Sequence, residues 1–413
     1  MNTFHLTNRI SRSVAKAAWK KARGESVLPP ALNAQTLDQD DVALARAWLY
    51  KREQWHDDAT VTRFEQAFAR WNGSKYAFAF MGGRVALSAS LAALGLRAGD
   101  EVIIPGYTCV LVPNAFHYAG ISTVYADIEL DTYGLDMNQL EQRITPRTRA
   151  ILLHHLYGLV ARDYAATLDL ARRYDLKVIE DCAQATGATY QGRRVGNDGD
   201  IGFYSSEVSK VFTTIMGGVV VTNDDTIAAG IREHYAQTPY PTADWIERQL
   251  QNVLLHYYES KHPQRWWLRE VAVARYGAGR LHNMPLEEQQ GTRPVDYNRR
   301  MPAPIAALGL NQLRKLDAYN QQRRTNAARW HQWCNTQGYR QPLVIPESEP
   351  VFLRYPVLVA PEQKHQTDWA LHNHGVQPGL WFKTHIHPVA WPVHHCHNAD
   401  QAVQQCINMP MLW

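Results

Sequence analysis

The sequence lacks the features that mark several large classes of protein. Its cysteines are few, odd in number and far apart, at positions 109, 182, 334, 396 and 406, and none forms a Cys-x-x-Cys pair. This argues against a disulfide scaffold or a cysteine-rich zinc site and favours a reducing, cytoplasmic location. No run approaches the roughly 18 uninterrupted apolar residues of a membrane-spanning helix. A net charge of only +4 gives no indication of a nucleic-acid partner.

What is present is typical of a globular protein with more than one domain. The 413 residues are 45% apolar and 20% charged, a balance found in globular chains, and this length predicts two or three domains. We find no internal repeat and no low-complexity tract. The predicted organisation has four parts: an N-terminal basic amphipathic extension (1–55), a large domain (56–239), a basic aromatic insert (240–295) and a small C-terminal domain (296–413).

The first 24 residues contain no acidic residue but six basic ones, which are Arg9, Arg12, Lys16, Lys20, Lys21 and Arg23. The apolar residues between them fall roughly on one helical stripe, which predicts a basic amphipathic helix. The apolar core of a secretory signal does not follow. The helix is interpreted either as a docking helix or frayed terminus, or as a segment that contacts an anionic membrane surface or mimics an organellar transit peptide.

Short apolar runs alternate with helical patterns through the large domain. Strands are predicted at 76–80, 101–104, 123–127, 150–154, 177–180, 201–205 and 218–222, and helices at 61–71, 83–96, 110–119, 137–143, 163–174 and 304–322. This alternation predicts an α/β fold with a doubly wound, mostly parallel sheet. Ligands of such sheets bind beyond the carboxyl ends of the strands. Residues that follow the strands are therefore the candidates for a functional site.

The stretch from 240 to 290 interrupts this rhythm. It is rich in aromatic and basic residues, and residues 253–281 hold only two acids, Glu259 and Glu270. We predict that it is helical. A cationic aromatic face of this kind suits either lipid headgroups and lipid-linked substrates or a subunit interface and core packing.

Two glycines follow the first strand of the large domain. Gly82 and Gly83 precede Arg84 and the start of a helix. Glycines at a strand-to-helix turn expose backbone N–H groups at the positive end of the helix dipole, which suits a phosphate, and an arginine adds a bidentate donor. The alternative for the glycines alone is an ordinary tight turn.

An acid and a lysine follow two later strands. Asp181 ends a β-branched strand beside Glu180, and by alternation one of these carboxylates points into the sheet face and the other into the crevice. A buried carboxylate needs a cationic partner, although Asp181 taken alone could equally cap a helix. Lys210 lies between hydroxyl-rich turns, where a lysine is either a desolvated, nucleophilic amine or a solvated loop charge. Together, a phosphate cradle, an acid and a lysine are what pyridoxal phosphate requires.

The order of further motifs supports this interpretation. Lys210 is followed by Thr213-Thr214 and Gly217-Gly218, and landmarks occur at 99–105, 155–158, 180–188 and 305–313. Over about residues 60–320, and more faintly to the end, the chain resembles the DegT/StrS-type family of pyridoxal-phosphate-dependent sugar aminotransferases. The resemblance implies a fold type I, aspartate-aminotransferase-like large domain and a smaller C-terminal α/β domain.

The resemblance also implies residue roles. Lys210 matches the Schiff-base lysine, Asp181 the acid on the pyridine nitrogen, and Gln184 the residue beside the ring hydroxyl. Ser205 matches a phosphate-binding serine five residues before the lysine, and Gly83 belongs to the turn that would bind the same phosphate. Asn298 matches an asparagine that reaches the phosphate of the neighbouring subunit's cofactor, which implies a homodimer with shared active sites.

The chain departs from the family pattern at several of these positions. Arg84 replaces a phosphate-binding threonine, and Cys109 replaces a ring-stacking aromatic, for which Tyr107 is the candidate substitute. Glu207 replaces a histidine, and Arg299 replaces a tyrosine. These changes leave the cofactor linkage in place and bring the usual nucleotide-sugar substrate into question.

The late histidines form a further candidate cluster. His385, His387, His394, His395 and His397 lie close together in the sequence. Their spacing is irregular for a metal site, so we expect no metal, and in the family a histidine-containing loop here resembles a substrate-edge segment.

The function implied by the resemblance is transfer of an amino group from an amino acid, glutamate, to a keto-sugar linked to a nucleotide, for polysaccharide or glycoconjugate synthesis. A dehydratase of the same family is disfavoured because such members carry histidine at the position of Lys210. The remaining alternative is a non-catalytic relative that binds a sugar or a membrane surface.

Overall fold

The computed structural model describes residues 33–261 and 285–412, together with the isolated positions 14–15, 18–19, 22 and 267. The predicted N-terminal amphipathic helix and most of the aromatic part of the insert lie outside the described residues. Among the residues that the structure describes, no helix is both long enough and apolar enough to cross a bilayer.

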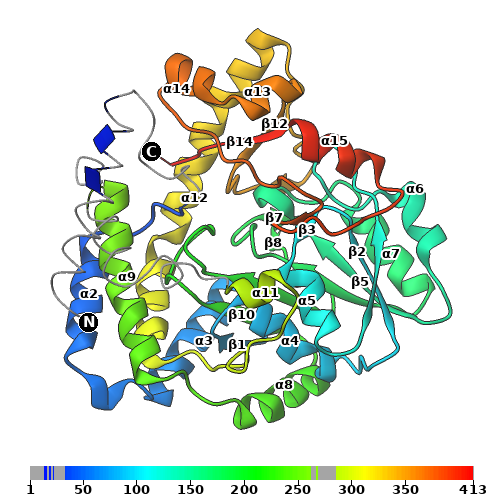
Figure 1. Cartoon of the computed structure of the whole chain (residues 1–413). Coiled ribbons are helices and arrows are strands. Elements are labelled where there is room, and N and C mark those ends of the chain that lie inside the picture. The colour runs from blue at the N-terminus through cyan, green and yellow to red at the C-terminus, as the bar shows by residue number, and fades with distance from the viewer. Residues whose placement is uncertain are drawn as a thin grey trace.

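The centre of the molecule is a seven-stranded sheet (Figure 1). Its order is β1 (Tyr76–Phe80), β10 (Gly218–Thr222), β9 (Ile201–Ser205), β6 (Lys177–Asp181), β5 (Thr148–His154), β2 (Glu101–Pro105) and β4 (Ser122–Ala126). β10 is antiparallel to both of its neighbours, and the other contacts are parallel. Six strands therefore point the same way, and their carboxyl ends meet at one edge.

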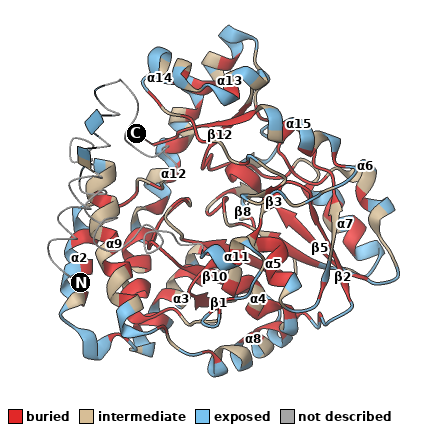
Figure 2. Cartoon of the chain, viewed as in Figure 1, coloured by how far each residue is buried: buried red, intermediate tan, exposed pale blue. Residues whose placement is uncertain are grey.

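Helices cover both faces of the sheet because the side chains of each strand alternate. In β1, Phe78 and Phe80 pack with α4 (Gly83–Ala93), α5 (Leu111–His117) and α8 (Asp225–Gln237). Ala77 and Ala79 face the opposite core, which contains α3 (Asp58–Asn72), α7 (Tyr164–Arg173) and part of α12 (Ala303–Gln337). The strands are buried between these two layers (Figure 2), as expected for a doubly wound sheet.

The long helix α12 belongs to two cores. Its first half packs against the sheet domain through residues such as Ile305 and Leu316. Its second half contributes Trp330 and Cys334 to a third cluster, that of the C-terminal domain. The predicted helix ended at residue 322, but apolar positions on the second half continue it to Gln337, where Gly338 in the left-handed conformation ends it.

The C-terminal domain is small and is joined to the sheet domain by a short strand pair. It contains β12 (Tyr355–Leu358) antiparallel to β14 (Cys406–Met409), with α13 (Pro361–His365), α14 (Asp368–His374) and α15 (His397–Gln405). β13 (Ile386–His387) runs parallel to β3 (Thr108–Cys109), which follows β2. This pairing brings a C-terminal segment to the edge where the sheet strands end.

The described part of the insert is helical, as predicted. α9 (Ala243–Lys261) packs along α2 (Gln39–Leu49), as Figure 1 shows, and Tyr257 is buried in the core. In this part of the insert the aromatic residues therefore serve packing. A short helix, α11 (Leu286–Gln289), follows and lies against α5.

All seven predicted sheet strands and all six predicted helices are present, the helix predicted at 137–143 as α6 (Met137–Leu140) followed by η2 (Glu141–Arg143); apart from the longer α12, their boundaries differ by a few residues. The remaining described elements are short: η1 (Arg52–Gln54), η3 (Leu156–Gly158), β7 (Thr189–Tyr190), β8 (Arg193–Arg194) and β11 (Ser348–Glu349).

Candidate active site

A cavity of about 350 Å³ lies beyond the carboxyl ends of β1, β9, β6 and β5. It is lined by six of the eight predicted site residues, which are Gly83, Arg84, Asp181, Gln184, Ser205 and Lys210. These residues come from four separate segments of the sequence, and only the parallel arrangement of the strands brings them together. Tyr107 and Asn298 are not among the lining residues.

Lys210 lies on a loop between β9 and β10 that is held by its own hydroxyl groups. Ser206 Oγ is 2.7 Å from Thr214 Oγ1, and the Thr213 hydroxyl donates to the Ser206 carbonyl oxygen at 3.2 Å. These contacts explain why two threonines follow the lysine at this spacing.

The long helix α12 also fixes this region. The Arg323 guanidinium donates to the Val211 carbonyl oxygen at 2.5 Å, and Gln312 accepts from the Thr213 N–H. Asn320 donates to the Thr186 carbonyl oxygen at 3.1 Å, just beyond the Asp181 segment. One helix therefore positions both the loop of Lys210 and the loop that follows Asp181.

Asp181 ends β6 with its carboxylate toward the cavity. Its Oδ1 accepts from the Ala183 N–H at 2.9 Å, and no helix begins there, so the alternative of a helix cap does not apply. Burial raises the pKa of Asp181, while the Ala183 N–H, the Lys210 amine and His155 act in the opposite direction. The site therefore holds a desolvated acid near an amine, and a further cation would stabilise its charged form.

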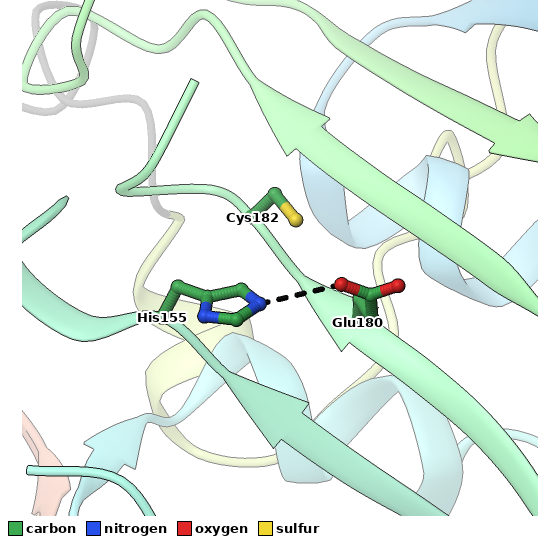
Figure 3. Close-up of side chains that lie close together, drawn as sticks. All are labelled: His155, Glu180 and Cys182. Carbon is green, nitrogen blue, oxygen red and sulfur yellow. Dashed lines mark hydrogen bonds and ion pairs between the residues drawn. The ribbon is translucent and has the colours of Figure 1, made fainter. Parts of the chain in front are cut away.

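Glu180, the preceding residue of β6, is fully buried and does not line the cavity. Figure 3 shows its carboxylate facing His155. Its carboxylate accepts from the Tyr164 hydroxyl and from the Gly196, Asp198 and Gly199 N–H groups. Burial acts to raise the pKa of Glu180, but these bonds and that with His155 hold it below its ordinary value.

His155 connects the Glu180 network to the cavity. Its Nε2 lies 3.3 Å from Glu180 Oε2, and its Nδ1 accepts from the Ala161 N–H. The neutral ring therefore carries its proton on Nε2 and donates it to Glu180. Cys182 lies close enough to His155 and Glu180 for the three to form a possible metal-ligand group. The oxygens of the Glu180 carboxylate, however, already accept hydrogen bonds from the surrounding donors. The arrangement is a buried hydrogen-bond network that supports the cavity floor.

Gly83 and Ser205 lie side by side at the end of the cavity nearest β1. A Cβ placed on Gly83 would lie 3.1 Å from Ser205 Cβ, so only glycine leaves room there. α4 begins at Gly83 and has no side-chain cap, and the serine hydroxyl lines the same cavity as the helix N-terminus. A helix N-terminus beside a hydroxyl suits a phosphate.

Arg84 adds a cation at this end, and it is paired. Its Nε lies 2.8 Å from Oε1 of Glu288, a residue of α11, and the two side chains are 11% and 0% exposed. Sequence reasoning did not identify Glu288, because no motif marks it.

The opposite wall of the cavity comes from the C-terminal domain, where the resemblance implied a histidine-containing substrate-edge segment, but Trp381 and Phe382 were not predicted as site residues. Trp381, Phe382 and His387 line it, and Lys210 Nζ lies 5.2 Å from the centre of the Trp381 ring, within range of a cation–π interaction. The abundance of tryptophan and histidine near the C-terminus was the only signal of this wall in the sequence.

Tyr107 lies behind this wall and supports it. Its hydroxyl accepts from the Phe382 N–H at 2.9 Å and is 3.1 Å from the Tyr157 hydroxyl, which donates to the Trp381 carbonyl oxygen. Tyr107 is fully buried and outside the cavity lining, so it has no ring face toward a cofactor. The aromatic face in the cavity belongs to Trp381.

The other predicted positions are placed as follows. Asn298 lies beside β1, where the Arg299 carbonyl oxygen accepts from the Met81 N–H, and its Oδ1 is buried with no hydrogen-bond donor among the described residues. Cys109 and Glu207 both line the cavity, and burial raises the pKa of the Cys109 thiol. Of the clustered histidines, only His387 lines the cavity.

The comparisons with known proteins agree with this geometry. A family model described as the DegT/DnrJ/EryC1/StrS aminotransferase family matches residues 36–413. A GDP-perosamine synthase of Caulobacter vibrioides is 44% identical over 172 residues, 42% of this chain and 46% of that protein. An L-glutamine:2-deoxy-scyllo-inosose aminotransferase of Micromonospora echinospora is 36% identical over 268 residues, 64% of this chain and 55% of that protein. The chain thus spans about half the length of the curated relatives it matches.

Solved structures show the same fold. The aminotransferase from Psychrobacter cryohalolentis matches with a TM-score of 0.69 and 25% identity, over 91% of this chain and 92% of that one. DesV of S. venezuelae matches with a TM-score of 0.68 and 25% identity, over 90% and 89%. The chain belongs to the DegT/DnrJ/EryC1/StrS aminotransferase family, which confirms the expected fold and the expected pyridoxal phosphate cofactor.

Proposed function

We propose that this family member transfers the amino group of an amino acid, glutamate, to the keto group of a nucleotide-linked sugar, and that pyridoxal phosphate is its cofactor. The observation that carries the proposal is the single cavity that contains Lys210, Asp181 and the Gly83–Ser205 turn. These three groups are what the cofactor requires at its aldehyde, its ring nitrogen and its phosphate.

The residues present fit the cofactor. The amine that acts on the desolvated Asp181 among the described residues is that of Lys210, and a protonated ring nitrogen would supply a further cation. The start of α4, Ser205 and Arg84 would hold the phosphate, and Lys210 would form the covalent link. When bound, pyridoxal phosphate supplies a ring that accepts the electron pair released when a proton leaves the neighbouring carbon.

The protein's own groups have distinct tasks in this reaction. Lys210 Nζ, once an incoming amine has replaced it, takes the proton from the carbon that bears that amine and later delivers a proton to the carbonyl carbon of the sugar. Asp181 keeps its negative charge fixed in a desolvated site, where it is worth more than in water. Gln184, whose Oε1 accepts from the Tyr157 N–H at 2.9 Å, is held against the cavity wall by the main chain.

The choice of substrate is supported by the named relatives. A GDP-perosamine synthase indicates a nucleotide-linked sugar, and the scyllo-inosose aminotransferases favour a second candidate, a cyclic polyol ketone with glutamine as donor. Arg84, Cys109 and Glu207 line the cavity, so three of the four departures from the family pattern lie where substrate or cofactor would bind; Arg299 is not among the lining residues.

A shared active site is also part of the proposal. The buried Asn298 Oδ1 without a donor supports it, since a group from a second copy would supply the missing partner. We propose a homodimer in which Asn298 serves the neighbouring cavity.

The test is a product assay. Purified protein with pyridoxal phosphate is incubated with glutamate or glutamine and a panel of ketones, including GDP-linked and other nucleotide-linked keto-sugars and scyllo-inosose, and the products are identified by mass spectrometry. Amination of a nucleotide-linked sugar supports the proposal, and amination of only the inosose supports the second candidate. Protein that takes up no cofactor and aminates no ketone would instead be a non-catalytic relative.

A further inference from the structure

Glu288 forms an unusual pair at the phosphate end of the cavity. Its side chain is fully buried, and its Oε1 lies 2.8 Å from Arg84 Nε. Neither of its oxygens has a hydrogen-bond donor of good geometry among the described residues. Arg84 is therefore the main compensation for a buried negative charge, which is costly without a partner.

Glu288 is held by a segment outside the sheet. The Asn114 side chain of α5 donates to the Glu288 carbonyl oxygen at 2.6 Å, and the Tyr118 hydroxyl donates to the Thr292 carbonyl oxygen at 3.0 Å. The next residue, Gln289, lines the cavity. In Figure 1, α11 lies over the edge where α5 and the strands end. The carboxylate is thus held beside the cavity, against the lining residue Arg84, by a short helix whose Gln289 lines the cavity.

Arg84 lies over the turn where a phosphate would bind. Its Nη1 is 3.9 Å from the point that a Cβ on Gly82 would occupy, and the Tyr297 hydroxyl donates to the Arg84 carbonyl oxygen at 3.1 Å. A phosphate at the start of α4 and the carboxylate of Glu288 are therefore both within reach of one guanidinium.

The surrounding charges favour competition between these two anions. Arg84 of α4 and Tyr118 beyond α5 face Glu288, and its own segment contributes Glu287, Arg293, Asp296 and Tyr297. Burial raises the pKa of Glu288, Arg84 lowers it, and the two neighbouring acids raise it. A dianionic phosphate beside this carboxylate would be repelled by it.

We infer that Glu288 is the resting counter-ion of Arg84 and competes with the cofactor's phosphate for it, so that Glu288 sets the affinity of the cavity for phosphate. The inference rests on the proposed function in one respect, namely that the anion bound at this turn is a phosphate. In this chain the arginine that replaces the family's threonine is thus accompanied by an acid that offsets its charge.

The test uses the full-length protein and two probes, inorganic phosphate and pyridoxal phosphate. Phosphate affinity is measured from the rise of the thermal midpoint with phosphate concentration, and cofactor affinity from a spectrophotometric titration. The variants are Glu288→Gln and the matched control Glu287→Gln, which changes an exposed neighbour on the same helix. Both glutamine variants are also made with Arg84→Thr.

Glu288→Gln should tighten the binding of both probes about tenfold, because an arginine that has lost its buried counter-ion gains more from an anion. Glu287→Gln should leave affinity unchanged, and the gain from Glu288→Gln should be much smaller in the Arg84→Thr background. Unchanged or weaker phosphate binding by Glu288→Gln, or an equal gain in both backgrounds, overturns the inference. If inorganic phosphate binds as expected but pyridoxal phosphate forms no link to Lys210, the proposed function fails and the role of Glu288 stands.

Discussion

The two walls of the cavity are built in different ways. The wall formed by the strand ends carries Asp181, Ser205 and Lys210, each at or shortly after the end of a parallel strand. The wall formed by the C-terminal domain carries Trp381 and His387 on an irregular segment, held by β13 and by buried tyrosines. The first wall has the groups that a cofactor needs, and the second has aromatic and polar groups suited to distinguishing substrates. Under the proposed function, catalysis would therefore depend on one domain and substrate selection on the other.

The largest expected effect compares two lysines, the partly buried Lys210 of the first wall and the buried Lys364 of the C-terminal domain. Lys210→Ala should abolish the cofactor's visible absorbance and all turnover, because the covalent link and the proton carrier are lost. Lys364→Met in the C-terminal domain removes an amine whose Nζ donates to three carbonyl oxygens. It should keep the absorbance and lower the free energy of unfolding by about 2 kcal/mol. Equal absorbance in both variants would contradict the assignment of Lys210.

The second effect tests whether Asp181, the acid of the first wall, affects the catalytic rate without affecting phosphate binding. Asp181→Asn keeps the shape of the side chain and removes its charge, and should lower kcat by roughly 10²–10³-fold. The affinity for inorganic phosphate should stay within about twofold, because Asp181 and the phosphate turn lie at different ends of the proposed cofactor site. A selective loss of phosphate binding would show that the charge serves another purpose.

The third effect lies in the second wall. Trp381→Ala should raise KM for the sugar about tenfold with little change in the cofactor's absorbance, because an aromatic contact surface is lost. Trp381→Phe should restore most of the affinity. If Trp381→Ala instead releases the cofactor, the division between the walls is wrong and the indole belongs to the cofactor site.

The fourth prediction concerns the pH dependence of stability, for which Glu65 beneath β1 and His387 in the second wall have opposite effects. Burial raises the pKa of Glu65, whose Oε1 accepts from the Ala79 N–H of β1, to about 7. The native state therefore favours the protonated acid. The contribution of Glu65 to the free energy of unfolding is complete below pH 4.5, and about 3 kcal/mol of it is lost as the pH rises through 7. Glu65→Gln should remove this loss in urea unfolding at pH 5 and 8, whereas Glu53→Gln, at an exposed site, should not.

His387 gives the opposite slope. Burial lowers its pKa to about 4, with Lys383 and Lys364 acting in the same direction. The native state therefore favours the neutral ring, and about 3 kcal/mol of stability is lost as pH falls from 6.5 to 4. His387→Gln should flatten the unfolding free energy over that acid range and leave the behaviour above pH 7 unchanged. If the unfolding free energy of His387→Gln falls at acid pH as much as that of the unsubstituted protein, another group is responsible.

The smallest effect is expected where the walls meet. Tyr107→Phe leaves the Phe382 N–H without its acceptor and should lower the free energy of unfolding by about 1–2 kcal/mol. It should raise KM for the sugar slightly and leave the cofactor's absorbance unchanged. Tyr174→Phe, which removes a hydroxyl bound to Glu141 at the surface, is the matched control and should change neither quantity.

The contrast between the walls also explains what could be predicted from sequence. Strand and helix patterns are local, and the side chains at strand ends follow from the topology of a parallel sheet. Lys210 and Asp181 were therefore predicted as partners, and the structure brings them into one cavity. The sides on which Glu180 and Asp181 lie also follow from strand alternation.

The rest depends on contacts between distant segments. Trp381 reaches the cavity only because β13 pairs with β3 and because Tyr157 and Asn408 bind its main chain. Glu288 reaches Arg84 only because α11 packs on α5. No periodic pattern or motif in the sequence marks either contact. The position of Tyr107 depends on the same wall, because its hydroxyl binds the Phe382 N–H, and for that reason it could not be predicted either.

The helix α12 has a mechanical consequence for any movement of the molecule. It is one continuous helix. Three of its side chains, Gln312, Asn320 and Arg323, form hydrogen bonds with the loops around Lys210 and Asp181. Because α12 continues unbroken to Gln337 and packs in the C-terminal domain, the same helix ties that domain to both loops. Any displacement of the helix would therefore carry the lysine and the acid together.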